Sequence, residues 1–471
     1  MSVSVFSAGG VSAGAPRVLG AALMALGAAL AAPCAIAFAA GEDSAQAFLF
    51  SMAVSGFCGA ALFALDVGRP ASASFSSVMV ALVAWWFVTP LFAALPFWAE
   101  TGGTLIDAYF EAASALTTTG GWLSPDAAAA SLAGHIWRAE LQWIGGLASL
   151  CVAAALFVRP EFVGIDTLLP PFSWGDQENS YQALLSALRT FTGAYTFLTG
   201  IGFLALYGAG FSPPDALTAA LSLAASGGFV PGGVDALSPV QLGALTPFVL
   251  LGGANFILVA RYFRSSARRT RDAETGWYVA AVATVGLGYW ATAGAAGASA
   301  IPAQIFNAAS LFSTNGMIVG EGPTLPIALV TIVIGGCAIS TAGGFKFLRW
   351  LVIFRRAREE IRRLVIPNAV FQRSSVANEF AVWIHFLVFT LTLGVVTLVV
   401  TLDGFPFELA ITAAASAIAN AGPALALAEG GGEGWSVFTE PVRLLLALAM
   451  ILGRLEAVVA LVLLNVTIWR D

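Results

Sequence analysis

The chain has 471 residues, of which 58% are hydrophobic and only 10% are charged, and its formal net charge is −6. Soluble globular domains carry about 25% charged residues, so this composition and the mean hydropathy of +0.86 exclude a soluble protein. Apolar stretches of about 20 residues recur along the chain, each long enough to cross a bilayer core of ~30 Å as a helix. The sequence therefore predicts an all-α polytopic membrane protein.

Two membrane helices are expected first, at residues 17–40 and 46–66. The apolar core of the first exceeds the about 7–15 residues of a signal-peptide h-region, so we expect it to be retained as a spanning helix.

Four short polar segments, each closed by a glycine, follow in the rest of the chain. They are Thr-Thr-Thr-Gly at 117–120, Ala-Ser-Gly-Gly at 225–228, Ser-Thr-Asn-Gly at 313–316 and Ala-Asn-Ala-Gly at 419–422. Each follows an apolar run that fits a helix too short to span the bilayer. These runs are 105–117, 214–225, 302–313 and 406–419. A serine lies six residues before each closing glycine, at Ser114, Ser222, Ser310 and Ser416. Recurrence at intervals of roughly one hundred residues predicts four pseudo-repeats around a central pore.

Each predicted repeat contains a long helix, a short pore helix, a polar segment and a second long helix. The N-terminal helix pair and the four pore repeats occupy residues 1–72, 73–172, 173–270, 271–372 and 373–471. About ten spanning and four re-entrant helices result, and re-entrant segments are tolerated where they line a water-filled cavity. Asp107 and Asp215 are expected to cap the first two short helices.

Basic residues predict the orientation in the membrane. They gather between the second and third repeats and between the third and fourth, at Arg261, Arg264, Arg268, Arg269, Arg271, Lys346, Arg349, Arg355, Arg356, Arg358, Arg362, Arg363 and Arg373. By the positive-inside rule these loops and both termini are cytoplasmic, and the polar segments open outward. The basic face is suited to anionic lipid or to an acidic partner.

The polar segments have the chemistry of a monovalent-cation filter. Backbone carbonyls replace the hydration shell of such an ion, glycine adopts the backbone angles this requires, and short helices aim their negative C-terminal ends at the ion. The predicted K⁺-binding residues are Thr118, Thr119, Gly120, Ser226, Gly227, Gly228, Thr314, Asn315, Gly316, Asn420, Ala421 and Gly422. The alternative is that these small residues only allow close helix packing.

A second glycine-rich stretch, residues 335–344, interrupts the apolar run from Leu325 to Arg356. Each glycine costs a helix about 1 kcal/mol, so we predict an irregular loop beneath the polar segments that gates the pore. The alternative is an intact helix with a glycine-lined packing face. The candidate gating residues are Gly335, Gly336, Ser340, Thr341, Gly343, Gly344, Lys346 and Arg454.

Arg454 lies near the middle of the apolar run 442–468. An intramembrane arginine costs at least ~2.5 kcal/mol and usually faces a cavity or a partner, and below a filter its charge opposes cation passage. The alternatives are a contact with Glu456 or hydrogen bonds to helix-end carbonyls. Lys346, the chain's only lysine, is expected to extend to the cytoplasmic interface or to pair with an acid.

No enzyme active site is predicted. His135 and His385 are isolated in apolar segments and are interpreted as packing residues, whereas Glu111 fits either polar packing or a charge near the outer mouth. Converging acids or a nucleophile–base pair at membrane depth are missing from the sequence pattern. A membrane scaffold for a soluble partner is a further alternative, supported only by the arginine-rich loops.

Five motifs together resemble the TrkH branch of the Trk/Ktr/HKT potassium transporters. They are Thr117-Thr118-Thr119-Gly120, Gln142-Trp143-Ile144-Gly145-Gly146, Ser226-Gly227-Gly228-Phe229, the stretch from Gly335 to Lys346, and Gly453-Arg454-Leu455-Glu456. The resemblance covers nearly the whole chain. It implies K⁺ uptake through a potassium-channel-like fold, no cofactor in this chain, a homodimer, and a cytoplasmic ring of nucleotide-binding TrkA-type subunits. It also implies that residues 335–344 are an intramembrane gating loop, that Arg454 faces this loop, and that glycine at all four closing positions favours K⁺.

Three departures from the family pattern concern ion selectivity. The fourth segment has Ala421 where a threonine is expected, the second has little side-chain oxygen, and the loop has Ala342 in place of a glycine. Transport of Na⁺ or of mixed monovalent cations, and K⁺ uptake coupled to H⁺ or Na⁺, therefore remain alternatives.

Overall fold

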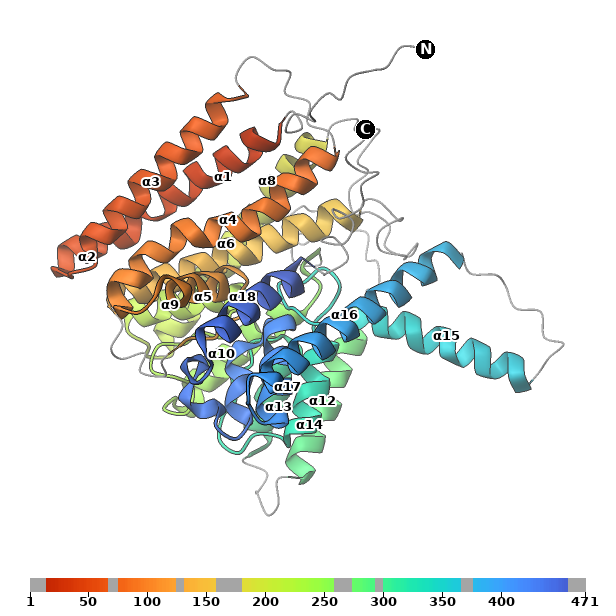
Figure 1. Cartoon of the computed structure of the whole chain (residues 1–471). Helices are drawn as coiled ribbons and strands as arrows, with labels where there is room; N and C mark the ends of the chain where they lie inside the picture. The colour runs from red at the N-terminus through yellow and green to blue at the C-terminus, as the bar shows by residue number, and fades with distance from the viewer. Residues whose placement is uncertain are drawn as a thin grey trace, which may run out of the picture.

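The structure, a computed structural model, describes residues 14–66, 75–123, 131–157, 180–257, 273–292, 300–365 and 376–455. The described residues form α-helices joined by short connections and a few 3₁₀ turns, with no β-strand among them (Figure 1). The all-α prediction is therefore confirmed.

The chain begins with a helical hairpin. Helices α1 (Ala15–Ala29) and α2 (Ala31–Ala40) follow one another almost without interruption, and α3 (Ala45–Ala64) returns beside them. A Cβ atom added to Gly20 would lie 2.6 Å from the carbonyl oxygen of Gly59, so α1 and α3 pack backbone against backbone. The hairpin lies against α4 (Phe75–Thr101) at one side of the molecule (Figure 1).

The remaining helices fall into four groups along the chain. The first contains α4, α5 (Leu105–Leu116) and α6 (Leu132–Phe157), and the second α8 (Ser180–Gly208), α9 (Pro213–Ala224) and α10 (Pro239–Gly253). The third contains α12 (Ala273–Thr292), α13 (Ile301–Phe312), α14 (Leu325–Ile334) and α15 (Phe347–Val365). The fourth contains α16 (Val376–Leu402), α17 (Phe407–Ile418), the 3₁₀ helices η3 (Gly422–Leu427), η4 (Gly431–Glu433) and η5 (Trp435–Val437), and α18 (Glu440–Arg454).

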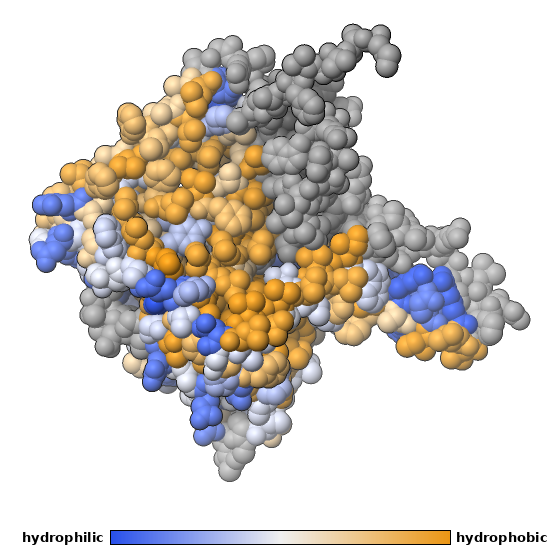
Figure 2. Space-filling model, viewed as in Figure 1, coloured by the Kyte–Doolittle hydropathy of each residue, from blue (hydrophilic) through white to orange (hydrophobic). Residues whose placement is uncertain are grey.

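Five helical segments among the described residues are long and apolar enough to cross a membrane. They are Ala15–Ala40, Ala45–Ala64, Val80–Thr101, Ala187–Gly208 and Val382–Leu402. Figure 2 shows continuous apolar surface over the region of α1, α3 and α4. Other predicted spans are shorter in the structure, such as α10 with 15 residues and α14 with 10.

Helices α5, α9, α13 and α17 have 12 residues each and are largely buried. At 1.5 Å per residue, such a helix is only about 18 Å long. The first begins with a capping box in which Thr104 Oγ1 accepts the Asp107 amide and Asp107 Oδ2 accepts the Thr104 amide, at 3.3 and 3.1 Å. Ser212 caps α9 in a similar way. The prediction that Asp107 and Asp215 are themselves the caps was wrong, because each lies three residues into its helix.

The long helices that follow the polar segments approach the short helices through glycines. A Cβ at Gly145 of α6 would lie 1.6 Å from the Leu116 carbonyl oxygen, and one at Gly453 of α18 would lie 2.1 Å from that of Ile418. Leu116 and Ile418 are the last residues of α5 and α17. These glycines therefore let the long helices support the short helices at the points where the polar segments begin.

The third group has a break at the predicted position. Helix α14 ends at Ile334 and α15 begins at Phe347, which excludes the intact-helix alternative. Helix α15 projects away from the bundle (Figure 1) and carries the partly exposed ion pairs Arg355–Glu359, Arg356–Glu360 and Arg363–Glu360. The predicted basic residues at 261–271 and 373 lie outside the described residues.

Candidate ion-binding site

The four polar segments share an unusual backbone conformation. The residue two positions before each closing glycine is left-handed, with φ of 58° at Thr118, 58° at Ser226, 57° at Thr314 and 55° at Asn420. Positive φ is uncommon outside glycine, so its recurrence at the same place in all four segments indicates a shared structural cause. The first three closing glycines also have positive φ, whereas Gly422 begins η3 and does not.

The four segments meet in a closed ring. A Cβ added to Gly120 would lie 1.8 Å from the Gly227 carbonyl oxygen, and one added to Gly228 would lie 2.0 Å from that of Asn315. A Cβ on Gly316 would lie 3.0 Å from the Ala421 oxygen, and a Cβ on Gly422 would lie 2.7 Å from the Thr119 oxygen. Each glycine thus contacts the residue just before the closing glycine of the next segment, and the fourth segment returns to the first. Three of these distances leave no room for a side chain.

Hydrogen bonds join neighbouring segments directly at two of the four contacts. The Gly422 amide donates to the Thr119 carbonyl at 2.7 Å, and Asn420 Nδ2 donates to Thr119 Oγ1 at 3.0 Å. The Gly228 amide donates to Asn315 Oδ1 at 3.2 Å. At the contact between the first and second segments, the hydrogen bond comes from Gln142 of α6 instead, whose Nε2 donates to the Gly227 carbonyl at 3.1 Å.

Gln142 is a site residue that sequence reasoning missed. It is fully buried, and its other amide atom, Oε1, has no hydrogen-bond partner among the described residues. The motif Gln142-Trp143-Ile144-Gly145-Gly146 was a signal for it, but its glycines favoured an interpretation as helix packing. The motif serves two roles: Gly145 packs on α5, and Gln142 donates a hydrogen bond to the ring.

Each segment also folds back on the serine six residues before its closing glycine. The carbonyls of Ser114, Ser222, Ser310 and Ser416 each accept an amide of their own segment. The first two serines use their side chains as well: Ser114 Oγ donates to the Gly121 carbonyl at 2.6 Å, and Ser222 Oγ accepts the Phe229 amide at 2.8 Å. These contacts give the predicted serine register a physical reason.

Four backbone oxygens of the ring are available to bind an ion. Within the described residues, the carbonyls of the left-handed residues Thr118, Ser226, Thr314 and Asn420 accept no hydrogen bond, although these residues are at most 1% exposed. Buried carbonyls are almost always paired, so an unpaired one in each of the four contacting segments makes these oxygens candidate ion ligands. Carbonyl oxygens of this kind suit a dehydrated monovalent cation, and the C-terminal ends of the short helices, which adjoin the segments, carry negative potential. No cluster of His, Cys, Asp or Glu that suits a metal ion occurs in the described ranges.

The loop between α14 and α15, residues 335–346, lies against this ring. Thr341 Oγ1 is 2.7 Å from Ser226 Oγ, and the Gly343 amide donates to Thr314 Oγ1 at 2.7 Å. The same loop is anchored to α10, where the Gly253 carbonyl accepts the Cys337 amide at 2.8 Å. The ammonium group of Lys346 lies back across the loop, donating to the carbonyls of Ala342 and, at 3.4 Å, of Ser340.

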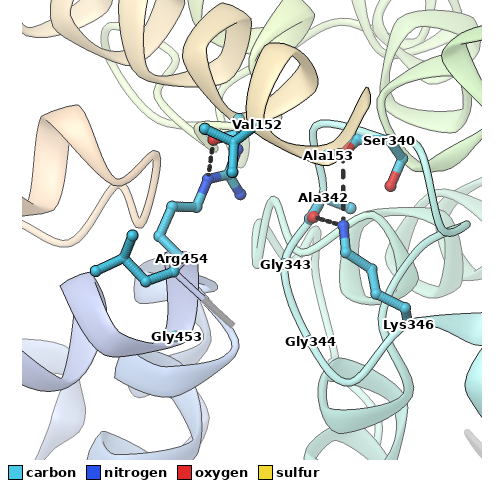
Figure 3. A pocket seen from close by; sticks show the side chains of 11 residues that line it. Val152, Ala153, Ser340, Ala342, Gly343, Gly344, Lys346, Gly453 and Arg454 are labelled. Carbon is cyan, nitrogen blue, oxygen red and sulfur yellow. Dashed lines mark hydrogen bonds between the residues drawn. The ribbon is translucent and has the colours of Figure 1, made fainter. Parts of the chain in front are cut away.

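Arg454 ends α18 and faces the loop across a small cavity (Figure 3). The cavity has a volume of about 30 Å³, and its lining includes Ala342, Gly343 and Lys346 from the loop. Arg454 Nε donates to Ser149 Oγ of α6 at 2.5 Å. The side chain therefore faces a cavity, as the functional interpretation requires, while Glu456 lies outside the described residues. Two basic side chains thus line one water-sized space beside the ring.

The remaining polar candidates form structural contacts. Glu111 pairs with Arg138 at 2.6 Å and its Oε1 accepts the Leu123 amide at 2.7 Å, which favours polar packing over a free outer charge. The guanidinium group of Arg138 also lies over the ring of Phe229, directly after the second segment. His385 lies 3.3 Å from Arg349 Nη1, and the His135 ring packs edge-on against Phe229.

These features define an all-helical membrane protein in which four polar, glycine-ended segments meet in a ring. Residues 323–469 match the TrkH family model, described as a cation transport protein. The chain is 27% identical to the Trk system potassium uptake protein TrkI of Halomonas elongata over 470 residues, 94% of each chain. It is also 27% identical over 418 residues to the Trk system potassium uptake protein TrkH of Escherichia coli, which covers 83% of this chain and 85% of that protein.

A solved structure agrees with these matches. The crystal structure of the potassium transporter TrkH from Vibrio parahaemolyticus superposes with a TM-score of 0.84 at 25% identity, covering 97% of this chain and 99% of the other. The resemblance to the TrkH branch is confirmed: residues 323–469 match the TrkH family model, and the chain is similar to Trk potassium uptake proteins over most of its length.

Proposed function

We propose that this protein takes up potassium across the bacterial plasma membrane through the ring formed by the four polar segments. The observation that carries the proposal is the closed ring itself, in which four buried left-handed residues leave their carbonyl oxygens unpaired. The names of the relatives, which are potassium uptake proteins, support K⁺ as the transported ion.

The chemistry of the proposed step is the replacement of water by carbonyl oxygens. A K⁺ ion entering the ring loses water and gains oxygen ligands that carry no full charge. The ion therefore binds favourably enough to enter the ring and weakly enough to leave it. The membrane potential drives inward movement with about 2.3 kcal/mol per charge for each 100 mV. No cofactor in this chain is required for this step.

The second part of the proposal concerns control. The 335–346 loop gates the pore below the ring, and Arg454 and Lys346 place positive charge beside the path, which opposes a cation while the loop is in place. We further propose that the protein works as a homodimer with cytoplasmic, nucleotide-binding TrkA-type subunits, and that both termini are cytoplasmic. The support is the resemblance to Trk systems and the basic helix α15, which projects from the bundle.

The fourth segment favours one alternative within transport. Gly422 lacks the positive φ of the other three closing glycines, and Ala421 offers no side-chain oxygen. A less regular ring discriminates less between ions, which supports transport of Na⁺ or mixed monovalent cations, or uptake coupled to H⁺ or Na⁺, as the second candidate.

Flux measurements separate these candidates. The purified full chain is reconstituted in liposomes with an inside-negative potential, and uptake of Rb⁺ and of Na⁺ is measured at equal concentrations. The proposal expects Rb⁺ uptake well above Na⁺ uptake and above empty liposomes. Equal rates for the two ions would reject K⁺ selectivity, and no uptake of either would reject transport by this chain alone. Repeating the assay at two pH values and with Na⁺ on one side tests coupling.

A further inference from the structure

The 335–346 loop contacts the side chains of two left-handed residues that belong to the ring. Thr341 Oγ1 lies 2.7 Å from Ser226 Oγ, and Thr314 Oγ1 accepts the Gly343 amide at 2.7 Å. Ser226 and Thr314 are the left-handed residues of the second and third segments. The loop therefore contacts two of the four residues whose backbone carbonyls are candidate ion ligands, and in the described residues it donates no hydrogen bond to those carbonyls.

The direction of the hydrogen bonds at Thr341 follows from donor counting. A hydroxyl has one proton to donate, and Thr341 Oγ1 is within 3.1 Å of the Gly252 carbonyl, which can only accept. Thr341 therefore donates to Gly252, and Ser226 donates to Thr341. The chain from Ser226 through Thr341 to α10 is buried throughout, with Ser226 at 0% and Thr341 at 2% exposure, so water cannot replace a lost partner.

The tip of the loop also limits the fourth segment. A Cβ at Gly343 would lie 2.1 Å from the Ala419 carbonyl and 3.2 Å from Asn420 Cβ, so the backbones are in direct contact. Asn420 is the left-handed residue of the fourth segment. The loop thus contacts the left-handed residues of three of the four segments, through hydrogen bonds at Ser226 and Thr314 and close packing at Asn420.

We propose that Thr341 is a positioning residue for selectivity: it holds Ser226 in its left-handed conformation, so that the ring prefers K⁺ only while the loop is in place. This inference rests on the proposed function, because it concerns the same ring. A side chain in the left-handed region is strained and needs fixed surroundings to stay there. Without the Thr341 hydroxyl, Ser226 has a buried donor to satisfy and the second segment relaxes. The site then adapts more easily to the smaller Na⁺ ion.

The test is the ratio of Rb⁺ to Na⁺ uptake by the reconstituted full chain carrying Thr341→Val, which keeps the shape of the side chain and removes the hydroxyl. A single neutral hydrogen bond supports a fall in this ratio of roughly twofold to tenfold, with Rb⁺ uptake retained. Thr341→Ser restores the hydroxyl and should restore the ratio. The matched control is Thr331→Val, a buried threonine on α14 whose hydroxyl bonds to Tyr289 and the Ile327 carbonyl, away from the ring.

Two further variants keep the test decisive. Ser226→Ala removes the same hydrogen bond by deleting its other partner, so it should also lower the ratio of Rb⁺ to Na⁺ uptake. The double variant Ser226→Ala with Thr341→Val should lower this ratio no further than either single variant. If Thr341→Val does not fold, Ser226→Ala alone decides. An unchanged ratio in a folded variant, or an equal fall in Thr331→Val, would overturn the inference. A wild-type chain without Rb⁺ selectivity would instead refute the proposed function.

Discussion

The tightest contact of the ring is the one between Gly120 and the Gly227 carbonyl, and Gly120→Ala tests it. The added Cβ would lie 1.8 Å from that oxygen, where real Cβ atoms keep at least 3.0 Å. The two segments must therefore separate by about 1 Å, and alanine at φ of 70° adds roughly 1–2 kcal/mol of backbone strain. An energy of ~1.4 kcal/mol is a tenfold effect on an equilibrium, so we expect Rb⁺ uptake to fall at least about tenfold. Gly120→Ser should in addition weaken the preference for Rb⁺ over Na⁺.

The assay is uptake of Rb⁺ and Na⁺ by reconstituted variants, with thermal unfolding in detergent as a check on folding. Gly243→Ala is the matched control, because Gly243 lies in α10 and an added Cβ meets nothing within 4 Å. Alanine is favoured over glycine in a helix by about 1 kcal/mol, so the control should be at least as stable as the wild type. Gly120→Ala with normal Rb⁺ uptake and normal selectivity would show that the close contact has no role in the ion path.

Three other variants test the surroundings of the ring. Arg454→Ala should raise Rb⁺ flux severalfold if this charge opposes cation passage, with Arg454→Lys close to the wild type; a loss of folding without a rise in flux would support a structural role. Glu111→Gln should lower the unfolding temperature strongly, because removing one partner of the buried pair with Arg138 costs about 3–5 kcal/mol, and an unchanged unfolding temperature would contradict the pairing. Gln142→Leu should reduce Rb⁺ selectivity while the chain still folds, since it removes the donor to the Gly227 carbonyl; selectivity equal to the wild type would show that this bond is dispensable.

The short helices were predicted from the sequence with good accuracy. The predicted ranges 105–117 and 302–313 compare with Leu105–Leu116 and Ile301–Phe312 in the structure. The reason is local: a polar cap before α5 and a proline in the first turn of α13 mark where these helices begin, and a glycine-ended polar segment marks where each ends. The break after Ile334 was also predictable, because several closely spaced glycines disfavour a helix.

Contacts between distant residues could not be predicted in this way. The pairing of Glu111 with Arg138 and the reach of Gln142 to Gly227 depend on how α5, α6 and the second segment pack. The left-handed conformation of Thr118 could not be predicted from the sequence either, because threonine has no local preference for it and the contacts within the ring impose it. The N-cap error at Asp107 was of a different kind: both Thr104 and Asp107 suit a helix start, and the capping box uses them together.

Locating a heavy K⁺ substitute in an experimental structure would test the ring as an ion site. Crystals grown or soaked with Tl⁺ or Rb⁺ should show anomalous density at the centre of the four polar segments, about 3 Å from the carbonyl oxygens of Thr118, Ser226, Thr314 and Asn420. Density only at other positions, with this centre empty or filled by side chains, would contradict the assignment of these segments to ion conduction.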